Sequence, residues 1–198
     1  MKTNLSELIC TRFNHDIIGN VGAVANAVEL LEEGDMDFLD DIKSILKTSS
    51  TVLSARLKFF RLAFGLQNPT LDDIEKVRNI SQAYLSTVGG KNPPQLEFDN
   101  INPIHHRGAM LTIMTLADLL IKGGTIKVCS QSGKTVISIQ NDVAVSAEKS
   151  QQVCNVLQNT AENLTAQDAP LLSLLEFCHK NSIVIKYTTS PSFQIVLE

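Results

Sequence analysis

The sequence predicts a mixed fold in which an N-terminal helical hairpin precedes an α/β sandwich. In the first third of the chain, apolar side chains recur every three or four residues, which is the period of an amphipathic helix. A Gly-Asp turn at positions 34 and 35 interrupts this pattern. Beyond residue 70, short β-prone segments alternate with helical ones, separated by turns rich in glycine, proline and polar residues. We therefore expect a hairpin over residues 1–67 and an α/β sandwich over residues 70–198.

The hairpin is predicted from two long helices, over residues 4–33 and 36–64. Gly34 suits the C-terminal cap of the first helix, Asp35 suits the N-cap of the second, and Gly65 ends the pair. The second helix carries apolar or small side chains at helical spacing along its length: Leu39, Ile42, Leu46, Ser49, Leu53, Leu57, Phe60 and Phe64.

Two helices packed on each other leave about half of each apolar stripe exposed to solvent. A second copy of the chain would cover these residues, which predicts a homodimer whose hairpins form a four-helix bundle. The alternative is that the hairpin packs on the rest of its own chain.

The second unit alternates helices and strands. Helices are predicted over residues 71–88, 103–122, 147–157 and 170–180. Strands are predicted over residues 95–98, 125–130, 135–140, 183–188 and 193–197. The Gln-Ser-Gly-Lys sequence at 131–134 predicts a β-hairpin between the second and third strands. This order predicts a mixed or antiparallel sheet covered by helices.

Composition argues against several classes of protein. The net charge is −4 and no basic stripe is present, which argues against nucleic-acid binding. No apolar run reaches the roughly 18 residues of a membrane span, and the first residues lack the apolar core of a signal peptide. We therefore expect a cytoplasmic protein without membrane association. The four cysteines have no short pairing and predict buried thiols, and His105-His106 lacks a nearby ligand at metal spacing, so no metal site is expected.

The strongest functional signal is a histidine, His15, followed at once by Asp16. If Ile17 is the centre of the buried stripe, rotation of about 100° per residue places His15 on roughly the opposite side of the helix. The stripe then contains Phe13, Val21, Val24, Val28 and Leu31. The histidine's side carries small or polar residues: Thr11, Arg12, Gly19, Gly22, Asn26 and Glu29.

The two glycines on this face need an explanation, because glycine inside a helix costs about 1 kcal/mol relative to alanine. Close approach of a bulky partner to His15 is one explanation, and a kink or a close helix crossing are others. A surface histidine with no function is the ordinary alternative.

This arrangement resembles the bacterial histidine kinases, which join a dimerisation and phosphotransfer hairpin to an ATP-binding domain of the Bergerat (GHKL) type. More specifically, the chain is similar to the alphaproteobacterial histidine phosphotransferases of the ChpT type. The similarity is carried by residues 15–23, Asn26, residues 29–32, residues 61–65 and residues 123–126. It implies that His15 accepts a phosphoryl group, and that residues 70–198 form a Bergerat α/β sandwich.

The nucleotide-binding motifs of that domain are degenerate in this chain. Ala117 falls near the place of the asparagine that holds magnesium. Asp142 stands without the glycines of the Asp-x-Gly-x-Gly turn, and residues 163–169 contain no glycine for a lid. Phosphate cradles need backbone N–H groups that glycine exposes closely. The resemblance therefore implies a degenerate ATPase-like domain with no ATP and no cofactor of its own.

The resemblance further implies a phosphorelay intermediate. A phosphorylated receiver domain of a hybrid kinase would dock, His15 would take its phosphoryl group, and the aspartate of a response regulator would receive it. The receiver would supply Mg²⁺. Asp16 is expected to hold the tautomer of His15 or to accept its proton, and Arg12 to meet phosphate oxygens. Simple solvation of both side chains is the alternative.

The docking surface is expected on the His15 face of the hairpin. The candidates on the first helix are Gly19, Asn20, Gly22, Val24 and Asn26, and those on the second are Arg56 and Arg61. The two arginines would steer an acidic receiver. Gly19 stands where kinases commonly carry Thr or Asn for phosphatase action, so autophosphatase chemistry is not expected. Two other interpretations stay open: a histidine kinase with an unusual ATP site, and a non-catalytic dimeric scaffold.

Overall fold

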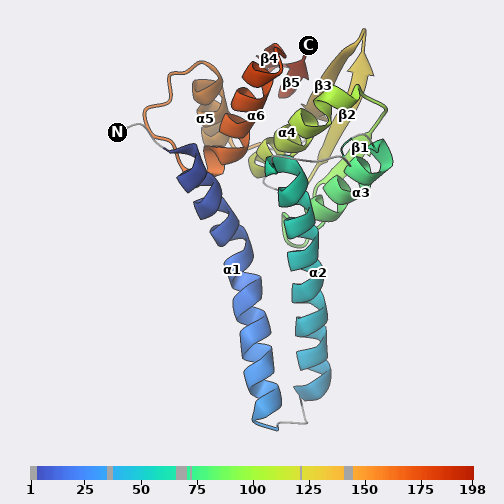
Figure 1. The fold of residues 1–198 in the computed structure, drawn as a ribbon, viewed down its shortest axis with the longest axis vertical. Coiled ribbons are helices and arrows are strands. Elements are labelled where there is room, and N and C mark those ends of the chain that lie inside the picture. The colour runs from blue at the N-terminus through green and yellow to red at the C-terminus, as the bar shows by residue number, and fades with distance from the viewer. Residues whose placement is uncertain (1–3, 35–37, 66–70, 72, 121, 141–144) are drawn as a thin grey trace.

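The computed structural model describes residues 4–34, 38–65, 71, 73–120, 122–140 and 145–198, and shows a long helical hairpin that projects from an α/β unit (Figure 1). The hairpin consists of α1 (Leu5–Glu32) and α2 (Leu39–Phe64). Both helices confirm the sequence prediction, although α2 begins three residues later than expected. The turn residues 35–37, including the predicted cap Asp35, lie outside the described residues.

The ends of the hairpin helices follow ordinary capping chemistry. The side chain of Asn4 accepts a hydrogen bond from the backbone N–H of Ser6, at 3.0 Å, which satisfies one free donor of the first turn of α1. Gly34 follows α1 with a φ of +75°, a left-handed conformation that glycine adopts without strain. Gly65 caps α2 as predicted.

The α/β unit contains one five-stranded sheet in the order β1-β2-β3-β5-β4. The strands are β1 (Gln95–Phe98), β2 (Thr125–Gln131), β3 (Lys134–Ile139), β4 (Ile185–Thr188) and β5 (Gln194–Leu197). Among the described strands, β1 pairs with β2 in parallel and the other pairings are antiparallel, so the sheet is mixed, which is one of the two arrangements predicted. Ser132 and Gly133 both have positive φ in the turn between β2 and β3, which matches a two-residue hairpin turn.

The helices of this unit are α3 (Ile74–Leu85), α4 (His106–Leu119), α5 (Ala147–Leu157) and α6 (Ala169–Lys180). Short 3₁₀ turns, η2 (Pro103–His105) and η3 (Ala166–Asp168), precede α4 and α6. α3 is shorter than predicted because Asp73 caps it, accepting from the backbone N–H of Lys76. α4 ends at Leu119 because Leu120 turns to an extended conformation and forms a β-bridge with Val145.

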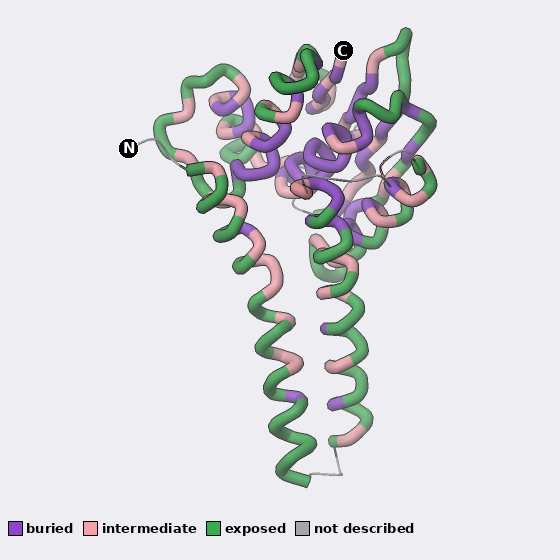
Figure 2. The backbone as a smooth tube through the Cα atoms, in the orientation of Figure 1, coloured by how far each residue is buried: buried purple, intermediate pink, exposed green. Residues whose placement is uncertain are grey.

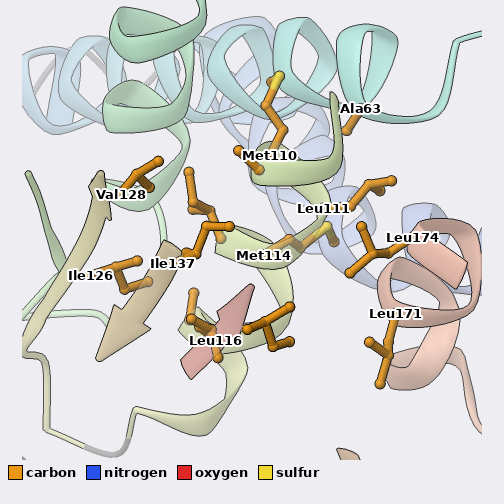
Figure 3. Close-up of a cluster of buried hydrophobic side chains, with 14 of the residues drawn as sticks. Ala63, Met110, Leu111, Met114, Leu116, Ile126, Val128, Ile137, Leu171 and Leu174 are labelled. Carbon is orange, nitrogen blue, oxygen red and sulfur yellow. The ribbon is translucent and has the colours of Figure 1, made fainter. Parts of the chain in front are cut away.

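The core centres on α4, which packs against β2, β3 and α6. Figure 3 shows side chains from four sources meeting there: α4, the sheet, α6 and the end of α2. Phe59, Leu62 and Ala63 of α2 are fully buried in this core. The base of the hairpin therefore packs on its own chain.

The far part of the hairpin is different, because its apolar residues remain largely uncovered (Figure 2). Phe13 is half-buried and stacks on Phe60 with ring centroids 4.4 Å apart. In contrast, Val21 and Val28, predicted to lie in the buried stripe, are 45% and 43% exposed. Leu57 of α2, expected to be buried, is 53% exposed. Coverage along the hairpin is therefore uneven: near its turn, Ala27 of α1 and Ile42 of α2 are each 1% exposed, whereas the two valines and Leu57 are exposed.

Three further properties concern the described residues only. No helix among them has the length and hydropathy needed to cross a bilayer. They contain no group of three or more histidine, cysteine or acidic side chains that could hold a metal. All four cysteines are free thiols; Cys10 is exposed on α1, which corrects the prediction that every cysteine is buried.

Candidate functional site

His15 stands exposed on α1 beside a carboxylate. Its side chain is 81% exposed, as the helical periodicity predicts. Ring nitrogen Nδ1 lies 3.2 Å from Oδ1 of Asp16. The rest of the ring, with the other nitrogen, Nε2, belongs to this largely solvent-exposed side chain. A neutral imidazole that donates from Nδ1 to Asp16 carries its free lone pair on Nε2.

Asp16 is held in turn by a buried arginine. Its Oδ2 accepts from Nε of Arg12 at 2.9 Å, one helical turn away. The two terminal nitrogens of Arg12 donate to both oxygens of Asp118, on α4, at 2.7 and 3.0 Å. The side chains of Arg12, Asp16 and Asp118 are 8%, 13% and 20% exposed. A continuous chain of charge-assisted hydrogen bonds thus links His15 to the α/β unit.

The electrostatics of this cluster keep Arg12 charged. Burial alone lowers the pKa of Arg12, but the hydrogen bond and the charge of Asp118 outweigh it and raise that pKa above its usual range. The neighbouring phenol of Tyr84 is fully buried, and burial, followed by the charge of Asp118, raises the pKa of Tyr84. Arg12 is therefore a permanent cation paired with two carboxylates. Its predicted contact with phosphate oxygens stays a prediction.

Of the two arginines predicted on α2, Arg56 lies beside the histidine. It donates from one terminal nitrogen to the backbone carbonyl of Asp16. Its Nε donates to the Thr87 hydroxyl at 3.1 Å, and its other terminal nitrogen donates to the Thr87 carbonyl at 2.8 Å. Arg56 therefore ties α1 to the turn that follows α3. Arg61 is exposed and does not line the cleft described next.

A cleft of about 670 Å³ opens between the hairpin and the α/β unit, with His15 on its wall. The cleft is lined by Thr11, Arg12, His15, Asp16, Arg56, Tyr84, Thr87, Val88, Gly89, Gly90, Asp118, Thr165, Ala166 and Gln167. Its walls come from α1, α2, α4, the end of α3 and η3. A segment of a partner that reaches into this cleft would meet the histidine directly.

The face of α1 beyond His15 is open. Gly19, Gly22 and Asn26 are exposed, and Asn20 and Val24 are half-buried. A Cβ atom added to either glycine would meet nothing within 4 Å. Within the described residues, a close helix crossing therefore does not explain these glycines, and close approach by a partner remains the stronger explanation.

A second cleft, of about 510 Å³, lies between α4, α5 and η3, in the unit predicted to be a degenerate ATPase-like domain. Ala117, compared above with a metal-holding asparagine, is buried, whereas Thr115 and Asp118 line the cleft. Asp168 is buried and accepts from the Thr165 backbone N–H at 2.7 Å, which closes the glycine-free segment into a capped turn. Asp142 lies outside the described residues.

The sequence did not indicate that Asp118, Tyr84 and Thr87 would line the same cleft as His15. A carboxylate at the end of an otherwise apolar helix was the one available signal for Asp118. Nothing in the sequence indicated which residue it would meet, because 106 positions separate it from Arg12.

No protein-family model matches the chain. A curated relative, the protein phosphotransferase ChpT of Brucella abortus (strain 2308), is 50% identical over 62 residues, which are 31% of this chain and 29% of that protein. The solved structure of a bacterial phosphotransferase matches with a TM-score of 0.73 and 22% identity, covering 98% of this chain and 95% of that one. A histidine kinase domain from Erythrobacter litoralis reaches a TM-score of only 0.45, with 10% identity over 90% of this chain and 92% of that one.

These comparisons confirm the similarity to a ChpT phosphotransferase that the sequence predicts. They also show that the fold, over nearly the whole chain, is that of a bacterial phosphotransferase. The sequence match itself spans less than a third of either protein.

Proposed function

We propose that this protein is a histidine phosphotransferase that relays a phosphoryl group between the aspartates of two receiver domains. The observation that carries the proposal is the exposed imidazole of His15, with Nδ1 beside Asp16 and Nε2 open to an approaching partner. The relay would run in a bacterial two-component phosphorelay, from a receiver domain of a hybrid kinase to that of a response regulator.

The chemistry is a pair of in-line displacements at phosphorus. In the first, the Nε2 lone pair of His15 forms a bond to phosphorus while the bond to the donor's carboxylate oxygen breaks, and the carboxylate leaves with the electron pair. The imidazole becomes cationic, and Asp16 stabilises the Nδ1–H or accepts its proton. In the second, the acceptor's carboxylate attacks phosphorus, the P–Nε2 bond breaks with its electron pair returning to Nε2, and His15 leaves as a neutral imidazole that has kept its Nδ1 proton or regained it from Asp16.

The surrounding residues mainly supply position. Alignment of two reactants accounts for a large part of such a rate enhancement, because phosphoryl transfer asks little covalent chemistry of the protein. Receiver domains bring the Mg²⁺ that neutralises the phosphoryl charge. The exposed face of Gly19, Gly22 and Asn26 is the docking surface on α1, and exposed Arg61 adds positive charge for steering an acidic receiver.

We also propose that the second cleft binds no ATP. In support, the segment that would form a glycine-rich lid instead contains a capped 3₁₀ turn with Thr165 and Asp168 bonded to each other. Asp118 is engaged with Arg12 rather than directed to a free metal position. The protein would then receive its phosphoryl group only from another protein.

A homodimer completes the proposal. Ile18, Val21 and Val28 repeat along α1 at helical spacing and are 65%, 45% and 43% exposed. Ile45 and Leu57 of α2 are also exposed. A second hairpin packed on these residues would bury them in a four-helix bundle.

Transfer from a radiolabelled receiver domain tests the function. We expect label on the wild type and on the control His179→Ala, which removes an exposed histidine of α6, and none on His15→Ala. The label should survive alkali and disappear in acid. Label on His15→Ala would refute the proposal, and label from ATP alone would favour a kinase. An unlabelled wild type that is dimeric in solution would favour a scaffold.

A further inference from the structure

We propose that Asp118, at the end of α4, is a positioning residue for His15 and acts through Arg12 and Asp16. The inference rests on the proposed phosphotransfer function and deepens it. It gives the α/β unit a role in phosphotransfer that requires no nucleotide.

Arg12 divides its hydrogen bonds between Asp118 and Asp16. Its two terminal nitrogens form a fork that matches both oxygens of a carboxylate, and this two-bond geometry is the strongest that an arginine offers. Asp118 occupies that fork at 2.7 and 3.0 Å. The Nε–H of Arg12 is directed at Asp16, where it reaches Oδ2 alone, at 2.9 Å.

The consequence appears at the second oxygen of Asp16. Because Arg12 holds only Oδ2, Oδ1 remains available to Nδ1 of His15, at 3.2 Å. Asp118 therefore holds the guanidinium in the orientation in which Arg12 contacts Asp16 through Oδ2 alone. In this way a residue that does not touch His15 keeps the Nδ1–H tautomer favoured and the Nε2 lone pair free.

Asp118 is itself fixed in place by the core. Its neighbours Ala117 and Leu119 are 2% and 1% exposed, so the end of α4 is anchored in the hydrophobic centre of the α/β unit. The Lys149 ammonium group donates to the backbone carbonyl of Asp118 at 3.0 Å. A site held by a rigid buried helix keeps its geometry better than one held by a loop.

Loss of the Asp118 charge frees the fork of Arg12. The arginine then turns its two terminal nitrogens to its remaining partner, Asp16, and removes Oδ1 from His15. We expect the fraction of the Nδ1–H tautomer to fall in Asp118→Asn. The rate of phosphotransfer should fall about tenfold, the lower end of what residues behind a reactive group contribute.

Nitrogen NMR of the His15 imidazole measures the tautomer directly in the free protein, with His15→Ala assigning the signal. The matched control is Asp40→Asn, which removes the charge of a carboxylate that is 98% exposed in the first turn of α2. We expect the tautomer to shift in Asp118→Asn and to be unchanged in Asp40→Asn. Thermal denaturation of each variant separates this effect from a loss of folding.

A second comparison tests the route through Arg12. In an Arg12→Gln background no fork exists, so adding Asp118→Asn should leave the tautomer unchanged. This pair also leaves no buried arginine unpaired, and a tautomer shift within it would overturn the proposal, because Asp118 would then act without Arg12. An unchanged tautomer in Asp118→Asn, or an equal shift in both backgrounds, would overturn the proposal. If the wild type accepts no phosphoryl group, the proposed function fails, while the tautomer comparison still decides the role of Asp118.

Discussion

His15 owes its proposed reactivity to the groups that constrain it. An exposed imidazole without constraint populates both neutral tautomers and many orientations. Here Asp16 contacts Nδ1, while Arg56 ties the backbone carbonyl of Asp16 to the turn at Thr87. The His15 side chain is therefore accessible to a partner, while Asp16 contacts its ring and Arg56 bonds to the backbone of α1 next to it.

Asp16→Asn should slow transfer without unfolding the protein. The amide keeps the size of the side chain but cannot accept the proton of His15 or stabilise its cationic form by charge. We expect the single-turnover transfer rate to fall about 100-fold, as for loss of a general base. Quenched-flow transfer from a labelled receiver measures this rate, with Asp40→Asn as the control. An unchanged rate would show that the Asp16 carboxylate takes no part in transfer.

Side-chain pairs within one helix could be predicted from the sequence, whereas pairs between residues far apart in the chain could not. Arg12 and Asp16 are one helical turn apart, so their pairing follows from helix geometry. The position of Arg56 beside His15, with Arg61 elsewhere, depends on how α1 and α2 are aligned. The contact with Asp118 depends on the packing of the whole chain.

Among the elements, α1 allows the proposed docking surface to be tested, because Gly19 and Gly22 are both exposed on it. Gly22→Ala should raise the free energy of unfolding by up to about 1 kcal/mol, since alanine favours the helix and its Cβ would meet nothing within 4 Å. The same methyl group should weaken receiver docking and slow transfer. Urea denaturation and receiver titration measure the two effects.

The control for this experiment is Ser44→Ala, an exposed change about three turns along α2 from Arg56. It should leave transfer unchanged. Faster or equal transfer by Gly22→Ala would show that no partner approaches this face.

The junction of η2 with the sheet predicts a pH dependence of stability. His105 is buried, and Nδ1 lies 2.9 Å from the Thr135 hydroxyl of β3. Burial, followed by the nearby His106, lowers the pKa of His105 below its ordinary value of 6.5. As the pH falls through 6.5 toward the lowered pKa of the folded state, the unfolded chain binds more protons at this histidine than the folded chain does. The free energy of unfolding should therefore fall as pH falls.

Urea midpoints at pH 7.5 and 5.5 measure this effect in the wild type and in His105→Gln. We expect the midpoint to drop more between these pH values in the wild type. An equal drop in both proteins would show that other groups cause it.

The elements themselves were largely predictable, because long periodic segments and glycine turns identify them. The predicted boundaries differ from the observed ones where tertiary contacts determine where a helix ends. The stop of α4 before Leu120 depends on its bridge to Val145, a partner that local sequence does not reveal. The exposure of Leu57 depends on what faces α2, which its periodicity cannot show.

For the whole molecule, the exposed apolar residues of the hairpin predict its association. The wild type should have twice the 21.7 kDa chain mass by light scattering, and the double variant Val21→Glu/Val28→Glu should be monomeric. The control Thr48→Glu adds a charge at an exposed polar position of α2 and should remain dimeric. A monomeric wild type would contradict the four-helix bundle.

The sequence predicted two consecutive units but not the contacts between them. Phe59, Leu62 and Ala63 of the hairpin lie in the core of the α/β unit, and Arg12 reaches α4. These contacts join residues far apart in sequence, so neither periodicity nor capping signals could reveal them. They are what places His15 at a cleft shared by both units.

The most direct test of the account is a complete relay with two receiver domains. A donor receiver carrying labelled aspartyl phosphate is mixed with an unlabelled acceptor receiver, with and without this protein. We predict that label reaches the acceptor only when the wild-type protein is present, by way of an acid-labile species on its chain, and that His15→Ala abolishes this passage. Equal labelling of the acceptor with His15→Ala would contradict the claim that His15 carries the phosphoryl group.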